Sequence, residues 1–242
     1  YLDTDKATVD IREAYKKHLI KMFQLFGFNA AQAKAKGEAV LRFETALAKF
    51  SKSSTELRDV EANYNKMTLA QFKAKYPNLP VEALLNAEGV KSAYFQSLVV
   101  GQPAFFAGLN KLVTTWNLAD RKAYMQWSVI NSSTGYLSSA VEAEHFDFFG
   151  KTMRGKKENF PLWKRATSQV ESVMGEALGR IYCERFFPAS SKTRMEELVK
   201  NLQVALAERI KDQDWMTAKT KEAALDKLNS FYVKIGYPNK WK

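Results

Sequence analysis

The segment WKRATSQVESVMGEALGRI, residues 163–181, carries the clearest pattern in this sequence. Its apolar side chains recur at steps of three or four residues: Trp163, Ala166, Val170, Val173, Ala177 and Ile181. Because an α-helix turns once every 3.6 residues, these steps bring all of these side chains to one side of a helix. The segment therefore predicts a long helix with a continuous apolar face, which Pro188 ends.

Two more helices are predicted on the C-terminal side of this segment. The first has the same spacing of apolar residues, at Met195, Leu198, Leu202, Leu206 and Ile210. The second begins after Thr217, whose hydroxyl suits an N-cap. Its apolar face contains Ala224, Leu228, Phe231 and Ile235. We expect the turn residues Gly236, Tyr237 and Pro238 to end it.

The first fifty residues predict a pair of helices. The apolar face of the first contains Ile11, Tyr15, Leu19, Met22 and Phe26. Gly27 is expected to end this helix, and Asn29 is a suitable N-cap for the next. The second helix places on one face Val40, Phe43, Leu47 and Phe50. The polar residues 51–55 interrupt the pattern, and a short third helix is expected over residues 56–62.

The middle of the chain predicts further helices and one short strand. Thr68 and Gln71 have the spacing of a capping box, and the helix that they begin should end before Pro77. Residues 97–100 are the best strand candidate, because they form a short β-branched run. Three helices are expected over residues 104–116, 119–133 and 138–153, followed by a polar loop at residues 154–158.

The composition agrees with a mainly α fold. Glycine and proline together make up about 7 % of the 242 residues, against about 12 % in an average protein. A chain so poor in helix breakers is unlike a sandwich or barrel, which needs many turns. We therefore expect more than two-thirds of the residues to be helical, with at most a few short strands.

Several classes of protein are not supported. One cysteine allows no internal disulfide, and no apolar run approaches the roughly 20 residues of a membrane span. The net charge of +11 comes from lysines spread along the chain, so nucleic acid is not an expected partner. Because the chain begins with Tyr1 and carries no signal peptide, we expect that an upstream segment has been removed or is missing.

Most catalytic signatures are missing, and one metal-like spacing occurs. The sequence contains no H-E-x-x-H, no P-loop and no G-x-S-x-G. Glu142 and His145 form Glu-x-x-His, which di-iron bundles use in two copies with two further carboxylates. No second copy exists, and His18 is the only other histidine. We therefore interpret His145 as a surface or interhelical residue.

Two other features could imitate functional sites. Cys183 lies near the C-terminal end of its predicted helix with no histidine close in sequence, so we interpret it as a structural residue. The densest basic patch is formed by Lys151, Arg154, Lys156 and Lys157, with Phe148, Phe149 and Phe160 nearby. A short patch without a nucleic-acid motif is more simply a solvated loop beside core aromatic residues.

Five segments resemble, in order, conserved blocks of the neprilysin-type zinc metallopeptidases. They are YLD at 1–3, YNKMTLAQ at 64–71, GRIYCERFFPASSK at 179–192, DWMTAKTKEAALDK at 214–227 and KIGYPNKW at 234–241. The family patterns are D-Y-Y-L-D, Y-N-K-M-T, G-x-L-Y-V-x-x-x-F-x-x-x-S-K, W-M-D-x-x-T-x-x-x-A-x-x-K and K-I-G-Y-P-x-x-W. The departures, Cys183 for an aliphatic residue and Thr217 for Asp, lie at positions that are not catalytic in the family.

The resemblance implies that this chain lacks the catalytic residues. In the family, the H-E-x-x-H helix, the third zinc ligand and the N-A-F-Y strand follow the I-G-Y-P block, and a substrate-binding Arg precedes D-Y-Y-L-D. No catalytic, cofactor-binding or metal-binding residue can therefore be assigned in this sequence. Zinc is expected in the downstream half, where two histidines and a carboxylate bind it and a Glu activates the zinc-bound water.

The resemblance also implies a structural role. Residues 1–90 are expected to be part of a helical cap domain, and residues 91–242 the N-terminal helical portion of the zinc peptidase domain, with a boundary between residues 86 and 91. In the family, these domains enclose a cavity that admits oligopeptides and excludes folded proteins. The expected partners are therefore the C-terminal half of the same peptidase and oligopeptide substrates.

Two hypotheses of function follow. The first is the non-catalytic N-terminal portion of a zinc metalloendopeptidase, inactive without its C-terminal half. The alternative is a non-enzymatic helical scaffold or binding module that has lost the zinc half. The low cysteine count favours a bacterial oligopeptidase as the relative, placed at the cell envelope, in the periplasm or outside the cell, with the cytoplasm as the alternative.

Overall fold

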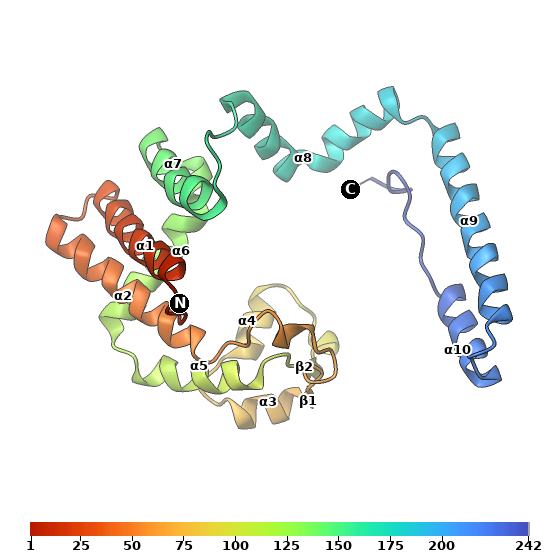
Figure 1. Ribbon diagram of the computed structural model, residues 1–242, viewed down its shortest axis with the longest axis horizontal. Coiled ribbons are helices and arrows are strands. Elements are labelled where there is room, and N and C mark those ends of the chain that lie inside the picture. Colours follow the sequence, from red (N-terminus) through yellow and green to blue (C-terminus); the bar gives the residue numbers. More distant parts are fainter. Residues whose placement is uncertain (242) are drawn as a thin grey trace. The chain divides into compact units, whose positions relative to one another are not determined.

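The computed structural model describes residues 1–241 (Figure 1). About 70 % of the residues are helical, and the described part of the chain contains ten α-helices and two short strands. These values confirm the mainly α fold. The chain divides into two compact units, Tyr1–Asn159 and Phe160–Lys242.

A helical hairpin forms the centre of the first unit. Helix α1 spans Lys6–Leu25 and helix α2 spans Ala30–Ala48. Gly27 joins them with a positive φ of 85°, and Asn29 forms the predicted N-cap together with Gln32. The facing sides are closely packed, because fully buried side chains come from both helices: Leu19, Met22, Phe23, Ala33 and Val40.

Two helices from the middle of the chain pack against this hairpin. Helix α6, Leu118–Ser133, contacts α2, and helix α7, Ser139–His145, contacts α1. The short 3-10 helix η3, Thr134–Tyr136, joins them. The predicted helix over residues 138–153 continues after α7 as a π-helix, η4, Phe146–Thr152. Such wider turns change the direction in which side chains leave a helix.

A small mixed region completes the first unit. Its two strands, β1 at Lys66–Thr68 and β2 at Ser97–Val99, are antiparallel, with Met67 opposite Leu98. The remaining elements are the short helices η1 (Glu56–Arg58), α3 (Leu69–Lys75), α4 (Val81–Ala87), η2 (Ser92–Tyr94) and the longer α5 (Pro103–Thr115). A second apolar core lies here, around Phe72, Tyr76 and Val100.

The helix predicted over residues 56–62 is wrong, because only the single 3-10 turn η1 forms there. Polar side chains take the backbone groups that a helix would use. The Asn63 side chain donates to the carbonyls of Glu56 and Asp59, and the Asp59 carboxylate accepts from the amide of Ala62. Local bonds of this kind compete with helix formation.

Three helices lie within residues 160–241, the described part of the second unit. Helix α8 spans Leu162–Phe186, α9 spans Ala189–Asp212 and α10 spans Ala218–Asn229. Helix α10 packs against α9. The predicted continuous helix α8 has a break, since Met174 has the non-helical angles φ −122° and ψ 27°. Gly175 follows directly, and glycine is a weak helix former.

The third predicted C-terminal helix ends earlier than expected. Helix α10 stops at Asn229, so Phe231 and Ile235 are not on its face. The Ser230 hydroxyl donates to the carbonyl of Lys227, which satisfies one of the open carbonyls at the helix end. Thr217 caps the beginning of α10 as predicted, by accepting from the amide of Thr220.

The division after Asn159 describes this chain alone. The boundary expected between residues 86 and 91 concerns how the segments are shared between the two domains of a complete protein. That boundary stays a prediction. Within the first unit, helices on both sides of residue 90 pack together, since α6 contacts α2.

Candidate functional site

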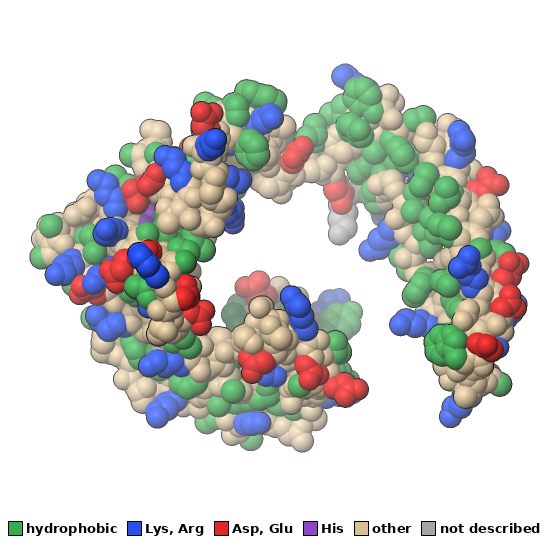
Figure 2. Space-filling view, viewed as in Figure 1, with side chains coloured by type: hydrophobic (Ala, Val, Ile, Leu, Met, Phe, Trp, Pro, Cys, Tyr) green, Lys and Arg blue, Asp and Glu red, His purple; other side chains and the backbone are tan. Residues whose placement is uncertain are grey.

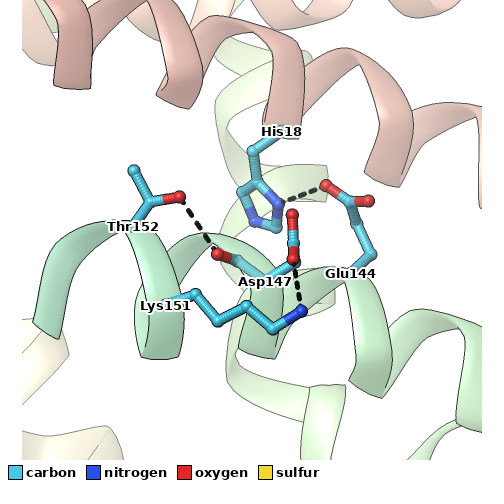
Figure 3. Close-up of polar contacts among 5 residues, drawn as sticks. All are labelled: His18, Glu144, Asp147, Lys151 and Thr152. Carbon is cyan, nitrogen blue, oxygen red and sulfur yellow. Dashed lines mark hydrogen bonds and ion pairs between the residues drawn. The ribbon is translucent and has the colours of Figure 1, made fainter. Parts of the chain in front are cut away.

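The two histidines of the chain lie beside each other in the first unit. His18, on α1, is 2 % exposed, and its Nδ1 lies 2.9 Å from Oε1 of Glu144 on α7 (Figure 3). The ring centres of His18 and His145 are 6.4 Å apart. The fold therefore brings together residues that are 127 positions apart in sequence.

Aromatic rings surround His18. Its ring stacks on Phe148 of the π-helix, at 5.0 Å and 14°, and meets the edge of Trp127 of α6 at 5.6 Å. His145 lies against Phe149, with ring centres 4.6 Å apart. The π-helix thus supplies aromatic contacts to both histidines. We interpret the group as part of the core that joins α1, α6 and α7.

Burial sets the charge of both histidines. Loss of solvent lowers the pKa of His18, although the hydrogen bond with Glu144 acts in the opposite direction. Burial lowers the pKa of His145 as well, and the nearby His18 and Arg154 add to this effect. Both imidazoles are therefore neutral near pH 7, because the ordinary value is about 6.5.

The neutral state fixes the tautomer of His18. An ionised carboxylate only accepts hydrogen bonds, so Nδ1 carries the proton and donates to Glu144. Nε2 is then an acceptor, and it makes no hydrogen bond with any group of residues 1–241. A buried acceptor without a partner weakens the core, which a fully apolar side chain of similar size would not do.

The Glu-x-x-His pair of Glu142 and His145 lies on α7, where the sequence predicts one helix face. Within residues 1–241, no group of three or more His, Cys, Asp or Glu side chains is arranged to hold a metal ion. Of the two places interpreted from the sequence, surface or interhelical, the structure has His145 half-buried, with its ring 6.4 Å from that of His18 on α1 and 4.6 Å from that of Phe149 on the π-helix.

A cavity of about 500 Å³ lies next to this aromatic group. A hydrogen-bonded chain forms part of its wall: Trp127 donates to the Tyr15 hydroxyl, and Tyr15 and Tyr1 donate to Glu44 at 3.1 and 2.8 Å. Burial raises the pKa of Glu44 and, together with the Glu44 charge, that of both phenols. The phenols thus stay protonated donors, which suits a structural role.

The basic patch borders this group, since Lys151 shares the π-helix with Phe148 and Phe149, whereas Cys183 lies in the second unit. Lys151 pairs with Asp147 at 3.0 Å within the π-helix, so part of the positive charge is balanced (Figure 3). Cys183 is half-buried on α8. Both histidines lie in the first unit, so no histidine accompanies Cys183 in the second.

The apolar faces of the second unit are exposed. On α9, the predicted line of Met195, Leu198, Leu202 and Leu206 is 40–61 % exposed. On α8, Trp163 and Val173 are 65 % and 75 % exposed. Figure 2 shows hydrophobic side chains gathered along one side of α9, with most charged side chains on the other. Exposed apolar surface of this extent is typical of an interface.

Comparisons with known proteins cover nearly the whole chain. The model of peptidase family M13 matches residues 1–238. A neutral endopeptidase of Lactobacillus helveticus is 28 % identical over 97 % of the chain, and Neprilysin-2 of Drosophila melanogaster is 30 % identical over 93 %. Among solved structures, the crystal structure of the zinc metalloprotease Zmp1 of Mycobacterium tuberculosis in complex with an inhibitor matches 98 % of the chain. The sequence identity is 33 % and the TM-score is 0.85.

The match covers only part of each relative. The chain spans 35 % of the Lactobacillus protein, 31 % of Neprilysin-2 and 36 % of the Zmp1 chain. It therefore spans about a third of the length of the relatives that it matches.

Proposed function

The chain belongs to peptidase family M13, and from this premise we propose that it is the non-catalytic N-terminal portion of a zinc-dependent metalloendopeptidase that hydrolyses oligopeptides. The observation that carries the proposal is the end-to-end family match over residues 1–238, combined with coverage of about a third of each relative. The roughly two-thirds of each relative that this chain does not match is long enough to hold a separate catalytic part. In this proposal zinc is bound there, and not by this chain.

The exposed faces of the second unit support a scaffolding role. Fully burying a leucine side chain stabilises a protein by about 1.5–3 kcal/mol. The four half-exposed side chains of the α9 line would therefore contribute on the order of 4 kcal/mol when covered. We propose that the downstream half of the peptidase covers them.

The first unit is proposed to help enclose a cavity for oligopeptides. Its buried residues support a rigid wall, because α1, α2, α6 and α7 share one continuous apolar core. In the complete protein, residues 1–90 would be part of the cap domain and residues 91–242 would belong to the peptidase domain. No helix within residues 1–241 is long and apolar enough to cross a membrane. The proposed location is the bacterial cell envelope, the periplasm or the exterior, with the cytoplasm as the alternative.

A complementation assay tests the proposal. Residues 1–242, the downstream half and an equimolar mixture are each given Zn²⁺ and a fluorogenic oligopeptide. We expect chelator-sensitive cleavage by the mixture and none by residues 1–242. Cleavage by residues 1–242 alone, in a preparation free of other proteases, would overturn the proposal. A mixture that binds no zinc and cleaves no peptide would favour the non-enzymatic scaffold.

A further inference from the structure

Two of the family-like segments meet in the second unit, at Lys192. This lysine lies in the first turn of α9, and its side chain is 13 % exposed. Its Nζ donates to the carbonyl of Tyr237 at 2.9 Å and to Oδ1 of Asn239 at 2.7 Å, and Glu196 lies 3.9 Å away. One ammonium group therefore connects α9 to a segment 45 residues later in the chain.

Ring contacts hold the same segment. Nζ of Lys192 lies 4.6 Å from the centre of the Tyr237 ring, a distance suited to a cation–π interaction. The Tyr237 ring also stacks on that of Trp241, with centres 5.9 Å apart and planes at 12°, and meets the Phe187 ring edge-on, with centres 6.1 Å apart and planes at 89°. Residues 237–241 are thus fixed by side chains, although they form no helix or strand.

Glycine permits the close approach to the end of α8. Gly236 has a positive φ of 67°, and a Cβ built there would lie 2.6 Å from the Phe187 ring. A larger residue would meet both a strained backbone and a clash. A Cβ built on Gly179 would lie 3.6 Å from the Trp241 ring, which is an ordinary contact distance. The segment is therefore seated against α8 as well as α9.

We propose that Lys192 is a positioning residue, which fixes the path of the chain where it leaves the second unit. The family-like segment 234–241 is the part that leads towards the downstream half. A fixed path there sets the distance and direction at which that half begins. The positioning of a zinc site rests on the proposed function, whereas the local attachment of residues 236–241 does not.

The experiment uses the complete peptidase that contains this chain, labelled with 5-fluorotryptophan. A Trp241→Phe variant assigns the ¹⁹F resonance of Trp241. K192M removes the ammonium group but keeps the length of the side chain, and K192R keeps the charge. The matched control is K200M, since Lys200 is an exposed lysine on the same helix. N239A removes one acceptor and leaves Lys192 in place, so it provides a milder perturbation if K192M does not fold.

We expect K192M to move the Trp241 resonance towards that of the unfolded protein and to lower kcat/KM by about tenfold or more, because small misplacements reduce catalysis strongly. Zinc content should stay the same. K192R should restore kcat/KM to within about threefold of the wild type, because it keeps the charge that the acceptors need. N239A should shift the same resonance less, and K200M should change neither quantity.

Two results would overturn the proposal. The first is an unchanged Trp241 resonance in folded K192M or, if K192M does not fold, in N239A. The second is a shifted resonance with unchanged kcat/KM, which would limit Lys192 to a local contact. Failure of the proposed function looks different, because the wild type would then cleave no peptide. In that case the Trp241 resonance still tests the attachment of the segment.

Discussion

Replacing His18 by alanine tests whether the aromatic group around it holds the first unit together. The His18 side chain is 1 % exposed, and its ring lies 5.0–5.6 Å from those of Phe148, Phe149 and Trp127. Large-to-small changes in such surroundings lower stability by about 2–5 kcal/mol. We expect His18→Ala to lower the free energy of unfolding by about 3 kcal/mol, because it removes the ring that α1 contributes to the aromatic group and leaves a cavity there.

Two companion variants separate packing from hydrogen bonding. His18→Leu keeps most of the volume and removes the Nε2 atom that has no partner. It leaves Glu144 without His18, but the Glu144 side chain is 22 % exposed and can be solvated. The expected loss is therefore about 1 kcal/mol or less. His145→Ala is the matched control, with an expected loss of about 1 kcal/mol, since that side chain is only half-buried.

Urea unfolding followed by tryptophan fluorescence measures these differences, since Trp127 is 3 % exposed and touches His18. The slope of the free energy against urea should stay constant between variants. A loss of less than about 1 kcal/mol in His18→Ala, as expected of a surface histidine, would show that His18 does not hold the core together. A loss in His18→Leu as large as that in His18→Ala would show that the hydrogen bond outweighs packing.

Three further predictions concern the pKa values of the histidines, the exposed line of α9 and Cys183. Because burial lowers the pKa of His18 and His145, these histidines bind protons at higher pH in the unfolded chain than in the folded chain. Their contribution to the free energy of unfolding should therefore be complete above about pH 6.5 and fall below it. Urea unfolding at several pH values should show a smaller fall in His18→Leu. Because the raised pKa of Glu44 acts in the opposite direction, the deciding quantity is the difference between the two proteins, and an equal or larger fall in His18→Leu would contradict this prediction. Leu202→Asp places a charge in the exposed α9 line and should lower the peptidase activity of the mixed halves by about tenfold or more. The control K200D, on the opposite side of α9, should not lower it. Equal effects of both variants would argue against an interface between the α9 line and the downstream half. Cys183→Ser should keep the activity of the complete enzyme within about threefold, and a large loss of turnover at unchanged stability would show that the thiol takes part in the reaction.

Local signals predicted much of the fold. The predicted N-cap Asn29 and the predicted capping box of Thr68 and Gln71 each begin a helix where expected, because the side-chain acceptor that caps a helix is visible in the sequence. Apolar spacing located α1, α2, α8 and α9 for the same reason: the period of a helix is a local property. Ser97–Val99 forms the predicted strand.

Features that depend on long-range contacts were not predicted. His18 falls on the line of Tyr15 and Met22, which could have marked it as buried, but the line alone does not reveal Glu144 as its partner on α7. The π-helix and the break at Met174 have no strong signal either, since both change only the local winding of a helix. The apolar line of α9 was found, yet spacing cannot show what covers such a face.

The zinc content of purified protein shows whether the metal is bound outside residues 1–242. Residues 1–242 and the complete protein are dialysed against Zn²⁺, freed of excess metal and measured by elemental analysis alongside intact mass. We expect about one tightly bound zinc ion in the complete protein, as a three-ligand catalytic site requires, and none in residues 1–242. Stoichiometric zinc in residues 1–242, or none in the complete protein, would contradict it.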